Sequence, residues 1–310
     1  MLDVQERLAA LGHVPDGDAE GTFGPSTRAA VEAFQRRRGL RIDGIVGSLT
    51  WERLVEAGRR LGDRSLQATS PLLRGDDVAE LQERLAALGF DPGRVDGIFG
   101  AVTRAAVAGF QHDAGLATDG IAGPATLAEL HRLAVRHPRS TLVNEVKERT
   151  ALRRGHGALA SMAVALGQAG GLEAVVEATA RELRARGARV VVVRDRDEVP
   201  LAATASATGA TCLVVVRLDP GAMAATALYF ASERSESPSG HRLADALAER
   251  VGRALGLPAV TRGMTLPVLR ETPMPASVLE MGPLDRVVER TGQLAEAVAL
   301  ALEGWGIPET

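Results

Sequence analysis

The stretch Leu81-Gln-Glu-Arg-Leu-Ala-Ala-Leu-Gly89 decides the fold of the first part of this chain, because it repeats Val4-Gln-Glu-Arg-Leu-Ala-Ala-Leu-Gly12 with only the first residue changed. Agreement in order and spacing continues beyond it and indicates a tandem duplication. We place the first copy at residues 1–60 and the second at residues 68–135. The further matching pairs are Gly21-Thr-Phe-Gly24 with Gly97-Ile-Phe-Gly100, Thr27-Arg-Ala-Ala-Val31 with Thr103-Arg-Ala-Ala-Val107, Phe34-Gln35 with Phe110-Gln111, and Asp43-Gly-Ile-Val-Gly47 with Asp119-Gly-Ile-Ala-Gly123.

Each copy is predicted to form three helices joined by glycine turns. In the second copy, Asp76 or Asp77 can cap a helix that ends at Gly89, since glycine suits the left-handed conformation after a helix. Residues 101–113 form the next helix, and Pro124 opens the third at a first helical position. The residues expected to point inward are Val78, Leu81, Leu85, Leu88, Val102, Ala106 and Phe110, with Phe34 as the counterpart of Phe110 in the first copy.

Composition narrows the classes of function. The 310 residues carry a formal net charge of -3, so the chain lacks the basic surface that binding to nucleic-acid phosphates requires. Cys212 is the single cysteine, which excludes an intramolecular disulfide. Within the apolar run 211–216 we expect it to be a buried structural thiol rather than a nucleophile.

The sequence also indicates where the protein is located relative to the membrane. No run approaches the roughly 20 apolar residues that a membrane span needs. The N-terminus enters an amphipathic helix without a positively charged region followed by an apolar stretch. We therefore expect a cytoplasmic protein, or a secreted one if the true start lies upstream.

Residues 136–158 are expected to form a charged linker. Pro138 breaks regular structure, and charges of both signs suit a solvated segment. His131, His137 and His156 lie in or beside it, but their spacing matches no metal-ligand motif. For these histidines we favour a solvated basic connector over a metal site.

From residue 159 onward the pattern changes to strands alternating with helices. Such alternation is typical of a mainly parallel sheet covered by helices. The chain is thus expected to be multidomain, with two all-α three-helix repeats followed by an α/β domain at residues 159–310. Apolar runs predict strands at 162–166, 189–193, 212–216, 225–230 and 277–279, with helices near 172–186, 240–255 and 286–303.

The two repeats resemble the peptidoglycan-binding-like domain that accompanies many bacterial wall hydrolases. The shared order is Gln, Leu and Leu-Gly, then Asp-Gly-x-Phe-Gly, Thr-x-x-Ala-Val-x-x-Phe-Gln, Gly-Leu and Asp-Gly-x-x-Gly. This resemblance implies affinity for glycan strands or stem peptides of the wall. Most matching residues are glycines and core apolar residues, so they specify the fold and identify no ligand-contacting atom.

The α/β domain resembles the zinc-dependent N-acetylmuramoyl-L-alanine amidases, which cut between muramic acid and the stem peptide. The resemblance is best in Val268-Leu-Arg-Glu-Thr-Pro-Met-Pro-Ala-Ser-Val-Leu-Glu-Met-Gly282, where Glu280 stands at the position of the catalytic glutamate. Leu183-Arg-Ala-Arg-Gly-Ala-Arg-Val-Val-Val-Val-Arg194 resembles the family's helix, glycine and strand. Two repeats before an amidase-like domain is similar to the organisation of the CwlM-like proteins of actinobacteria.

The chain departs from that family at the metal site. The amidases hold zinc with a histidine in an Asp-Pro-Gly-His-Gly-Gly turn, a glutamate shortly after it, and a second histidine at a strand end. Here the turn is Leu166-Gly-Gln-Ala-Gly-Gly171, so Ala169 stands at the first histidine position, and Arg217 stands at the second. Glu173 corresponds to the glutamate in an alignment that the shortened loop leaves open. Since a catalytic zinc needs three protein ligands, the comparison implies a lost zinc site and no metal cofactor.

Glu280 has two interpretations. As a general base it needs a zinc-bound water to act upon, whereas as a structural carboxylate it can pair with Arg217, which we favour. Removing the metal but keeping Glu280 and Glu173 leaves like charges facing each other unless a cation such as Arg217 intervenes. His156 imitates the family's Gly-His-Gly turn but precedes the buried strand, so we do not expect it to rescue the site.

Two hypotheses of function follow. The favoured one is a non-catalytic protein that binds peptidoglycan or its precursors and regulates cell-wall peptidoglycan synthesis, with an enzyme of precursor synthesis as a candidate partner. The alternative is an active zinc-dependent N-acetylmuramoyl-L-alanine amidase, which is a cell-wall hydrolase. Neither hypothesis requires nucleic acid or a membrane span, and neither names the ligand-contacting residues.

Overall fold

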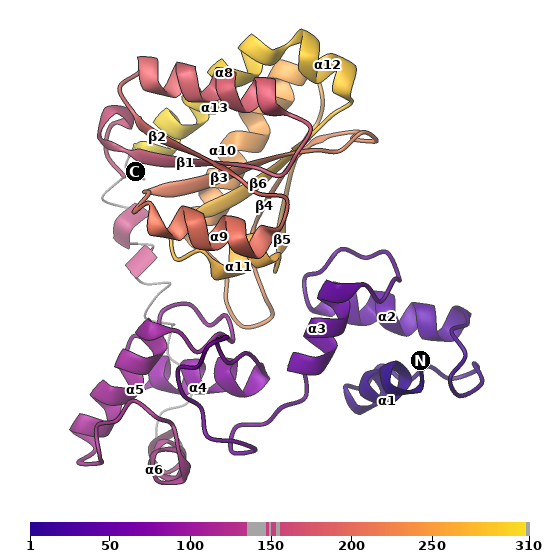
Figure 1. The fold of residues 1–310 in the computed structure, drawn as a ribbon, viewed down its shortest axis with the longest axis vertical. Helices are drawn as coiled ribbons and strands as arrows, with labels where there is room; N and C mark the ends of the chain where they lie inside the picture. The colour runs from indigo at the N-terminus through magenta and orange to yellow at the C-terminus, as the bar shows by residue number, and fades with distance from the viewer. Residues whose placement is uncertain (135–146, 149, 153–155, 308–310) are drawn as a thin grey trace. The chain divides into compact units, whose positions relative to one another are not determined.

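The computed structural model describes residues 1–134, 147–148, 150–152 and 156–307 (Figure 1). Most of the expected linker at 136–158, with His137 and Pro138, therefore lies outside the described residues. The chain forms two compact units, one with the helical repeats and one with the α/β domain. No helix in the described ranges is long and apolar enough to cross a membrane.

Both repeats consist of three helices, as predicted. The first contains α1 (Leu2–Ala10), α2 (Pro25–Arg37) and α3 (Ser48–Glu56), and the second contains α4 (Asp76–Ala87), α5 (Ala101–Asp113) and α6 (Pro124–Ala134). Gly89, which follows α4, has a φ of 90°, the left-handed conformation that favours glycine. Pro124 is the first residue of α6, as expected.

Two details of the second repeat differ from expectation. Gly75 is the N-cap of α4, and the buried Asp77 instead accepts hydrogen bonds from the guanidinium of Arg64 at 2.7 and 3.2 Å. Val102 is 54% exposed, so its inward assignment is wrong. The buried face of α5 includes Thr103, and Val102 lies one residue step, about 100°, around the helix from it.

Each repeat has its own hydrophobic core. Phe34 is 0% exposed and Phe110 is 1% exposed, which confirms their equivalent inward positions. Phe110 packs edge-on against Phe90, with ring centroids 5.6 Å apart. The buried residues of the second core are Leu66, Val78, Leu81, Leu85, Phe99, Ala106, Val107, Phe110, Ala122 and Leu130.

Four buried glutamines hold the glycine turns, a role that the sequence comparison missed. Gln111 donates hydrogen bonds through Nε2 to the carbonyl oxygen of Ile121 at 2.9 Å and to Oγ1 of Thr126 at 3.0 Å. Its Oε1 accepts a hydrogen bond from the backbone N–H of Gly120 at 2.8 Å. The same three hydrogen bonds, to a carbonyl oxygen, to a threonine Oγ1 and from a glycine N–H, are formed by Gln5, Gln35 and Gln82. The spacing Gly-x-x-Gly-x-x-Thr, present four times, is the sequence signal for this arrangement.

The α/β domain contains one six-stranded sheet in the order β2-β1-β3-β6-β4-β5. β1, β2, β3 and β6 are parallel, while β4 runs antiparallel to β6 and parallel to β5. The mainly parallel sheet is thus confirmed. The strands are β1 (Ala163–Gln168), β2 (Arg189–Arg194), β3 (Cys212–Leu218), β4 (Ala225–Phe230), β5 (Ala259–Met264) and β6 (Ala276–Met281).

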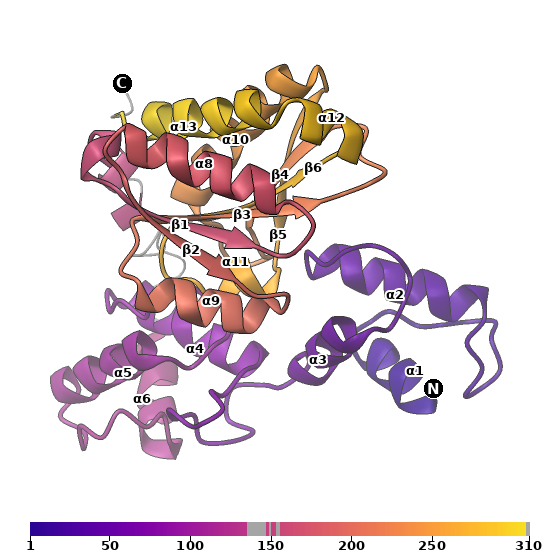
Figure 2. The same cartoon turned by 45° about the horizontal axis from the view of Figure 1, so that its top comes forward.

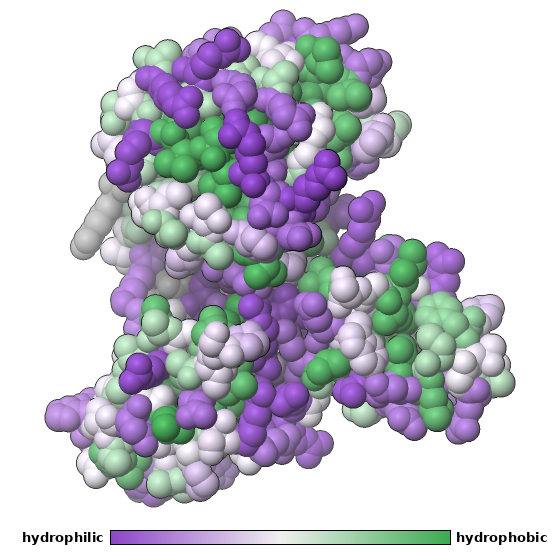
Figure 3. Space-filling view, in the orientation of Figure 1, coloured by the Kyte–Doolittle hydropathy of each residue, from purple (hydrophilic) through white to green (hydrophobic). Residues whose placement is uncertain are grey.

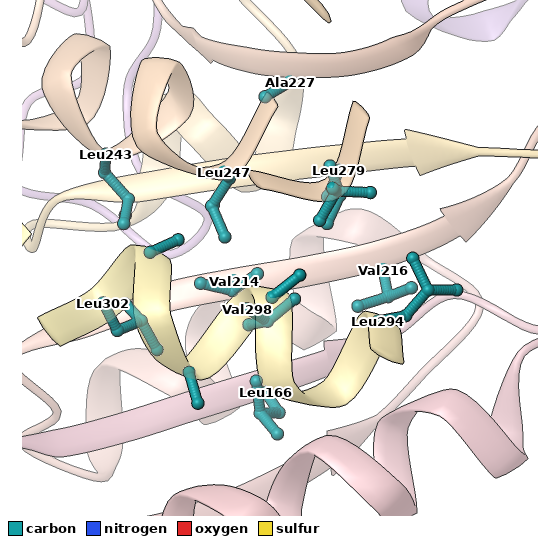
Figure 4. Close-up of a cluster of buried hydrophobic side chains, with 14 of the residues drawn as sticks. Leu166, Val214, Val216, Ala227, Leu243, Leu247, Leu279, Leu294, Val298 and Leu302 are labelled. Carbon is teal, nitrogen blue, oxygen red and sulfur yellow. The ribbon is translucent and has the colours of Figure 1, made fainter. Parts of the chain in front are cut away.

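Helices cover both faces of this sheet (Figure 2). On one face lie α8 (Glu173–Ala185), α10 (Pro238–Leu255) and α13 (Thr291–Gly306), with α12 (Leu284–Glu289) beside them. Figure 4 shows leucine and valine side chains of β1, β3 and β6 pointing toward α10 and α13. On the other face lie α9 (Glu198–Ala207) and α11 (Pro267–Glu271). A short 3-10 helix at Leu159–Ser161 precedes β1.

The ranges predicted from periodicity omit β5, α9 and α11, and they merge α12 with α13 into one helix. β5 is an edge strand whose residues are mostly exposed or half-buried, so it lacks the apolar run that marks a buried strand. The helices α11 and α12 have five and six residues, too short for a helical periodicity to emerge. The other five strands and the three long helices fall where they were expected, within a few residues.

Cys212 is fully buried at the start of β3, and burial raises the pKa of its thiol to about 12. The thiolate is the reactive form, so we expect the folded protein not to react with Ellman's reagent at about pH 8. In concentrated guanidinium chloride the same sample should release one equivalent of thionitrobenzoate per chain. Rapid reaction of the folded protein would show that Cys212 is accessible and not a structural thiol.

Candidate functional site

The carboxyl ends of three neighbouring parallel strands meet at one edge of the sheet. The register pairs Gln168 of β1 with Val216 of β3, and Arg217 of β3 with Glu280 of β6. Ala169 directly follows β1, and it packs against the apolar cluster formed with α9 and α11. The edge at the carboxyl ends of parallel strands is where open α/β sheets place their ligands.

Arg217 and Glu280 form the contact that the sequence predicts. Nη2 of Arg217 donates to Oε1 of Glu280 at 2.6 Å, and Nε donates to the same oxygen at 3.2 Å. The side chains are 31% and 22% exposed, so the pair is partly removed from water. Because register partners on neighbouring parallel strands point to the same face, the sheet itself brings the two side chains together.

Glu198 supplies a second carboxylate, which sequence reasoning did not identify. Nη1 of Arg217 donates to Oε1 of Glu198 at 3.1 Å. The other carboxylate oxygen of Glu198 accepts a hydrogen bond from the backbone N–H of Val268 at 3.3 Å. Glu198 is the first residue of α9, where a negative charge also suits the helix dipole. The guanidinium of Arg217 therefore joins β3, β6 and α9.

Glu173 does not take part in this cluster. It begins α8, whose buried residues Val175 and Val176 pack on the opposite face of the sheet from α9. Its side chain is exposed. Arg217 follows Leu213 and Val215 in the strand alternation, and both face α9 and α11. The expectation that Glu173 contributes to the pocket of Arg217 is thus wrong, and Glu198 occupies that role.

The residues at this edge do not fit a zinc ion. Ala169 offers no donor atom, and a guanidinium such as that of Arg217 has no lone pair for a metal. A permanent cation also repels a divalent ion. In the ranges that the structure describes, no group of three or more histidine, cysteine, aspartate or glutamate side chains is placed to hold a metal ion.

His156 is placed differently from the solvated connector that the sequence predicts. Its ring stacks on Trp305, with centroids 3.8 Å apart and planes 11° from parallel. Its backbone N–H donates to the carbonyl of Gly306 at 3.0 Å. Burial, and secondarily the charge of Arg242, lower the pKa of the imidazole. His156 thus packs against the end of α13, while His131 is exposed on α6.

Comparison with known protein families matches both parts of the chain. The family model described as "Putative peptidoglycan binding domain" matches residues 1–54 and 74–130. The N-acetylmuramoyl-L-alanine amidase CwlM of Mycobacterium tuberculosis is 34% identical over 334 residues, which cover 96% of this chain and 81% of that protein. The amidase CwlL of Bacillus licheniformis is 35% identical over 151 residues, covering 42% of each chain.

Solved structures of N-acetylmuramyl-L-alanine amidases also align with this chain. The crystal structure of the N-acetylmuramyl-L-alanine amidase Ami1 from Mycobacterium smegmatis aligns with a TM-score of 0.40 and 15% sequence identity. The alignment covers 48% of this chain and 98% of that chain.

Proposed function

Because this chain belongs to the family of the N-acetylmuramoyl-L-alanine amidase CwlM, we propose that it is a non-catalytic member, which binds peptidoglycan or its precursors and regulates cell-wall peptidoglycan synthesis. The observation that carries the proposal is the cluster in which Arg217 contacts Glu280 and Glu198. This cation lies at the strand end where the amidase resemblance calls for a zinc ligand. A glutamate engaged by a guanidinium, at an edge where Ala169 and Arg217 offer no metal-donor atoms, lacks the arrangement of a metal-assisted general base.

The helical repeats support the binding half of the proposal. Both match the peptidoglycan binding domain model, and each keeps an intact core and two of the four buried glutamines. Their fold is therefore preserved, whereas the amidase-like domain has lost donor atoms. Preserved binding repeats beside a domain with alanine and arginine at two zinc-ligand positions of the resemblance favour recognition over hydrolysis.

We expect the purified protein neither to retain stoichiometric zinc nor to release stem peptides from peptidoglycan. Elemental analysis measures the zinc, and chromatography of muropeptides measures the release. The Arg217→His variant should also remain without zinc, because Ala169 still provides no ligand; Ala169→His with Arg217→His is the matched variant that restores both imidazoles. About one zinc per chain, together with hydrolysis abolished by a chelator, would establish the alternative, an active zinc amidase.

The ligand and partner require a separate experiment. Cosedimentation of the full chain with purified sacculi tests binding to mature peptidoglycan. A pull-down from the native cytoplasm, with identification of bound muropeptides and proteins, tests precursor binding and an enzyme partner of precursor synthesis. Cell fractionation tests the cytoplasmic location that the sequence favours. Cosedimentation at the level of an unrelated control protein, with no muropeptide recovered, would contradict the binding proposal.

A further inference from the structure

The turn between β1 and α8 presents a row of backbone N–H groups without acceptors. Within it, Gly170 and Gly171 have φ angles of 106° and 83°, in the left-handed region that favours glycine. In the described part of the chain, no hydrogen bond involves the N–H groups of residues 170–175. Helix α8 has 13 residues, and no side chain caps its N-terminus. Successive free N–H groups at a glycine turn form a concavity that attracts anions.

A second, independent feature is the side chain of Gln168, the last residue of β1. It is only 6% exposed, yet its Oε1 has no hydrogen-bond partner. Its Nε2 also forms no hydrogen bond with any residue that the structure describes. A buried amide without partners lowers stability. A ligand that supplies both an acceptor and a donor would satisfy it, since the amide has two N–H donors and an acceptor oxygen.

Strand alternation directs the side chain of Gln168 toward the start of α8. Leu166 packs in the core that α8 covers, together with Leu172, which directly precedes α8. Gly167 faces the other side of the sheet, where an added Cβ would meet Leu201 of α9 at 3.1 Å. Side chains two residues apart in a strand point to the same face. Gln168 therefore lies on the face of α8, about 7 Å along the strand from Leu166 toward the turn.

The turn is accessible and separate from the cluster of Arg217. It lies at the carboxyl ends of the parallel strands, where open α/β sheets bind ligands, but on the face of the sheet opposite to Arg217. Helix α8 is at the surface of the domain, and hydrophilic residues gather over it in Figure 3. Among residues 168–175, Glu173 carries the one charged side chain. It opposes an anion at the turn, but it is exposed, so solvent screens its charge.

We infer that residues 168–175 bind the diphosphate group of a peptidoglycan precursor. The N–H groups of Gly170, Gly171 and the first turn of α8 donate to phosphoryl oxygens, as does Nε2 of Gln168. Oε1 of Gln168 accepts a hydrogen bond from a hydroxyl of the neighbouring sugar. A diphosphate links the sugar of such precursors to a nucleotide or a lipid, whereas glycan strands of the mature wall lack it. The inference rests on the proposed function and narrows the ligand to precursors.

The test titrates the full chain with inorganic pyrophosphate as the probe. Calorimetry should detect binding, and the amide resonances that shift should be those of residues 170–175. The variant Gln168→Leu should weaken binding by at least about tenfold, because it removes a hydrogen bond to a charged group. Its melting temperature should not fall, since leucine removes an unpaired buried amide. Lower affinity without lower stability separates a ligand contact from a structural role, whereas unchanged affinity would overturn the inference.

Removal of the charge of Glu173 should have the opposite effect. Glu173→Gln should tighten binding by about two- to fivefold, as expected for the loss of an exposed like charge. The control Glu177→Gln removes the same charge one turn further along α8, where Glu177 pairs with Arg194. It should change the affinity by less than about twofold, because the effect of a charge at a helix end falls off within the first turn. Equal effects of the two variants would mean that net charge attracts the probe, which overturns the inference.

Competition experiments identify the source of the diphosphate. A nucleotide-linked muramyl peptide and a lipid-linked one in phosphatidylcholine vesicles are each added to the pyrophosphate complex, and displacement by either supports the inference. Failure of both to displace the probe would mean an anion site unrelated to the wall, and displacement by muropeptides without phosphate would assign the turn to the mature wall. Each of these results overturns the inference. Cosedimentation with sacculi but no binding of pyrophosphate would overturn it as well, while the proposed function would stand.

Discussion

Truncation of Phe110 to alanine should lower the free energy of unfolding of the helical unit by about 3–5 kcal/mol. The ring is 1% exposed and belongs to the core of the second repeat. Removing it forfeits apolar burial and leaves a cavity that α4 and α6 cannot close without moving. Phe34→Ala should have an effect of the same size, because Phe34 is 0% exposed in the first repeat. Denaturant unfolding monitored by circular dichroism measures both losses.

The matched control for these variants is Ile42→Ala. Ile42 is a large apolar residue of the first repeat that is 49% exposed, and its truncation should change the free energy of unfolding by less than about 0.5 kcal/mol. Losses under about 1 kcal/mol for both phenylalanine variants would mean that the two cores are not built around these rings.

Replacement of Arg217 by methionine should destabilise the α/β domain by about 2–4 kcal/mol. The variant keeps much of the apolar stem but leaves Glu280 and Glu198 facing each other without the cation that bridges them. Like charges in a partly desolvated site are costly. Because roughly a quarter of each side chain remains exposed, solvent screening keeps the loss toward the lower part of this range.

Two further variants show whether the loss comes from the charges. Arg217→Met combined with Glu280→Gln and Glu198→Gln should recover most of the stability, since the uncompensated carboxylates are gone. Arg194→Met is the matched control, because Arg194 also ends a strand but pairs with Glu177 on the surface; its loss should be under about 1 kcal/mol. A triple variant as unstable as Arg217→Met would show that packing of the arginine stem, and not charge compensation, stabilises the site.

Local patterns in the sequence predict most of the architecture. The duplicated order of leucines, glycines and Phe-Gln pairs fixes two three-helix repeats, because helical periodicity and glycine turns are properties of neighbouring residues. Buried strands such as β3 can be predicted from their apolar runs. The edge strand β5 and the short helices α11 and α12 carry too few buried residues to produce such a pattern, and only packing on the sheet defines them.

Some features of the candidate site can likewise be predicted from the sequence, and others depend on the tertiary structure. The assignment of Ala169 and Arg217 to the positions of two zinc ligands comes from the resemblance to the amidases, and the pairing of Arg217 with Glu280 follows from two neighbouring strands. Glu198 could not be foreseen, because its contact depends on where α9 lies over the sheet. The prediction that Glu173 lies near Arg217 is wrong because α8, which Glu173 begins, packs on one face of the sheet, whereas Arg217 lies on the other.

The order of residues alone predicts two helical repeats followed by an amidase-like sheet domain. Which carboxylates surround Arg217, and which of two nearly identical turns is buried, depends on tertiary packing. Phe23 and Phe99 occupy the same place in the repeat, yet one is exposed and the other is buried. The difference comes from residues 64–75, which pair with one turn and not the other. The burial of such a side chain depends on the path of the whole chain, so it cannot be predicted from a local pattern that both repeats share.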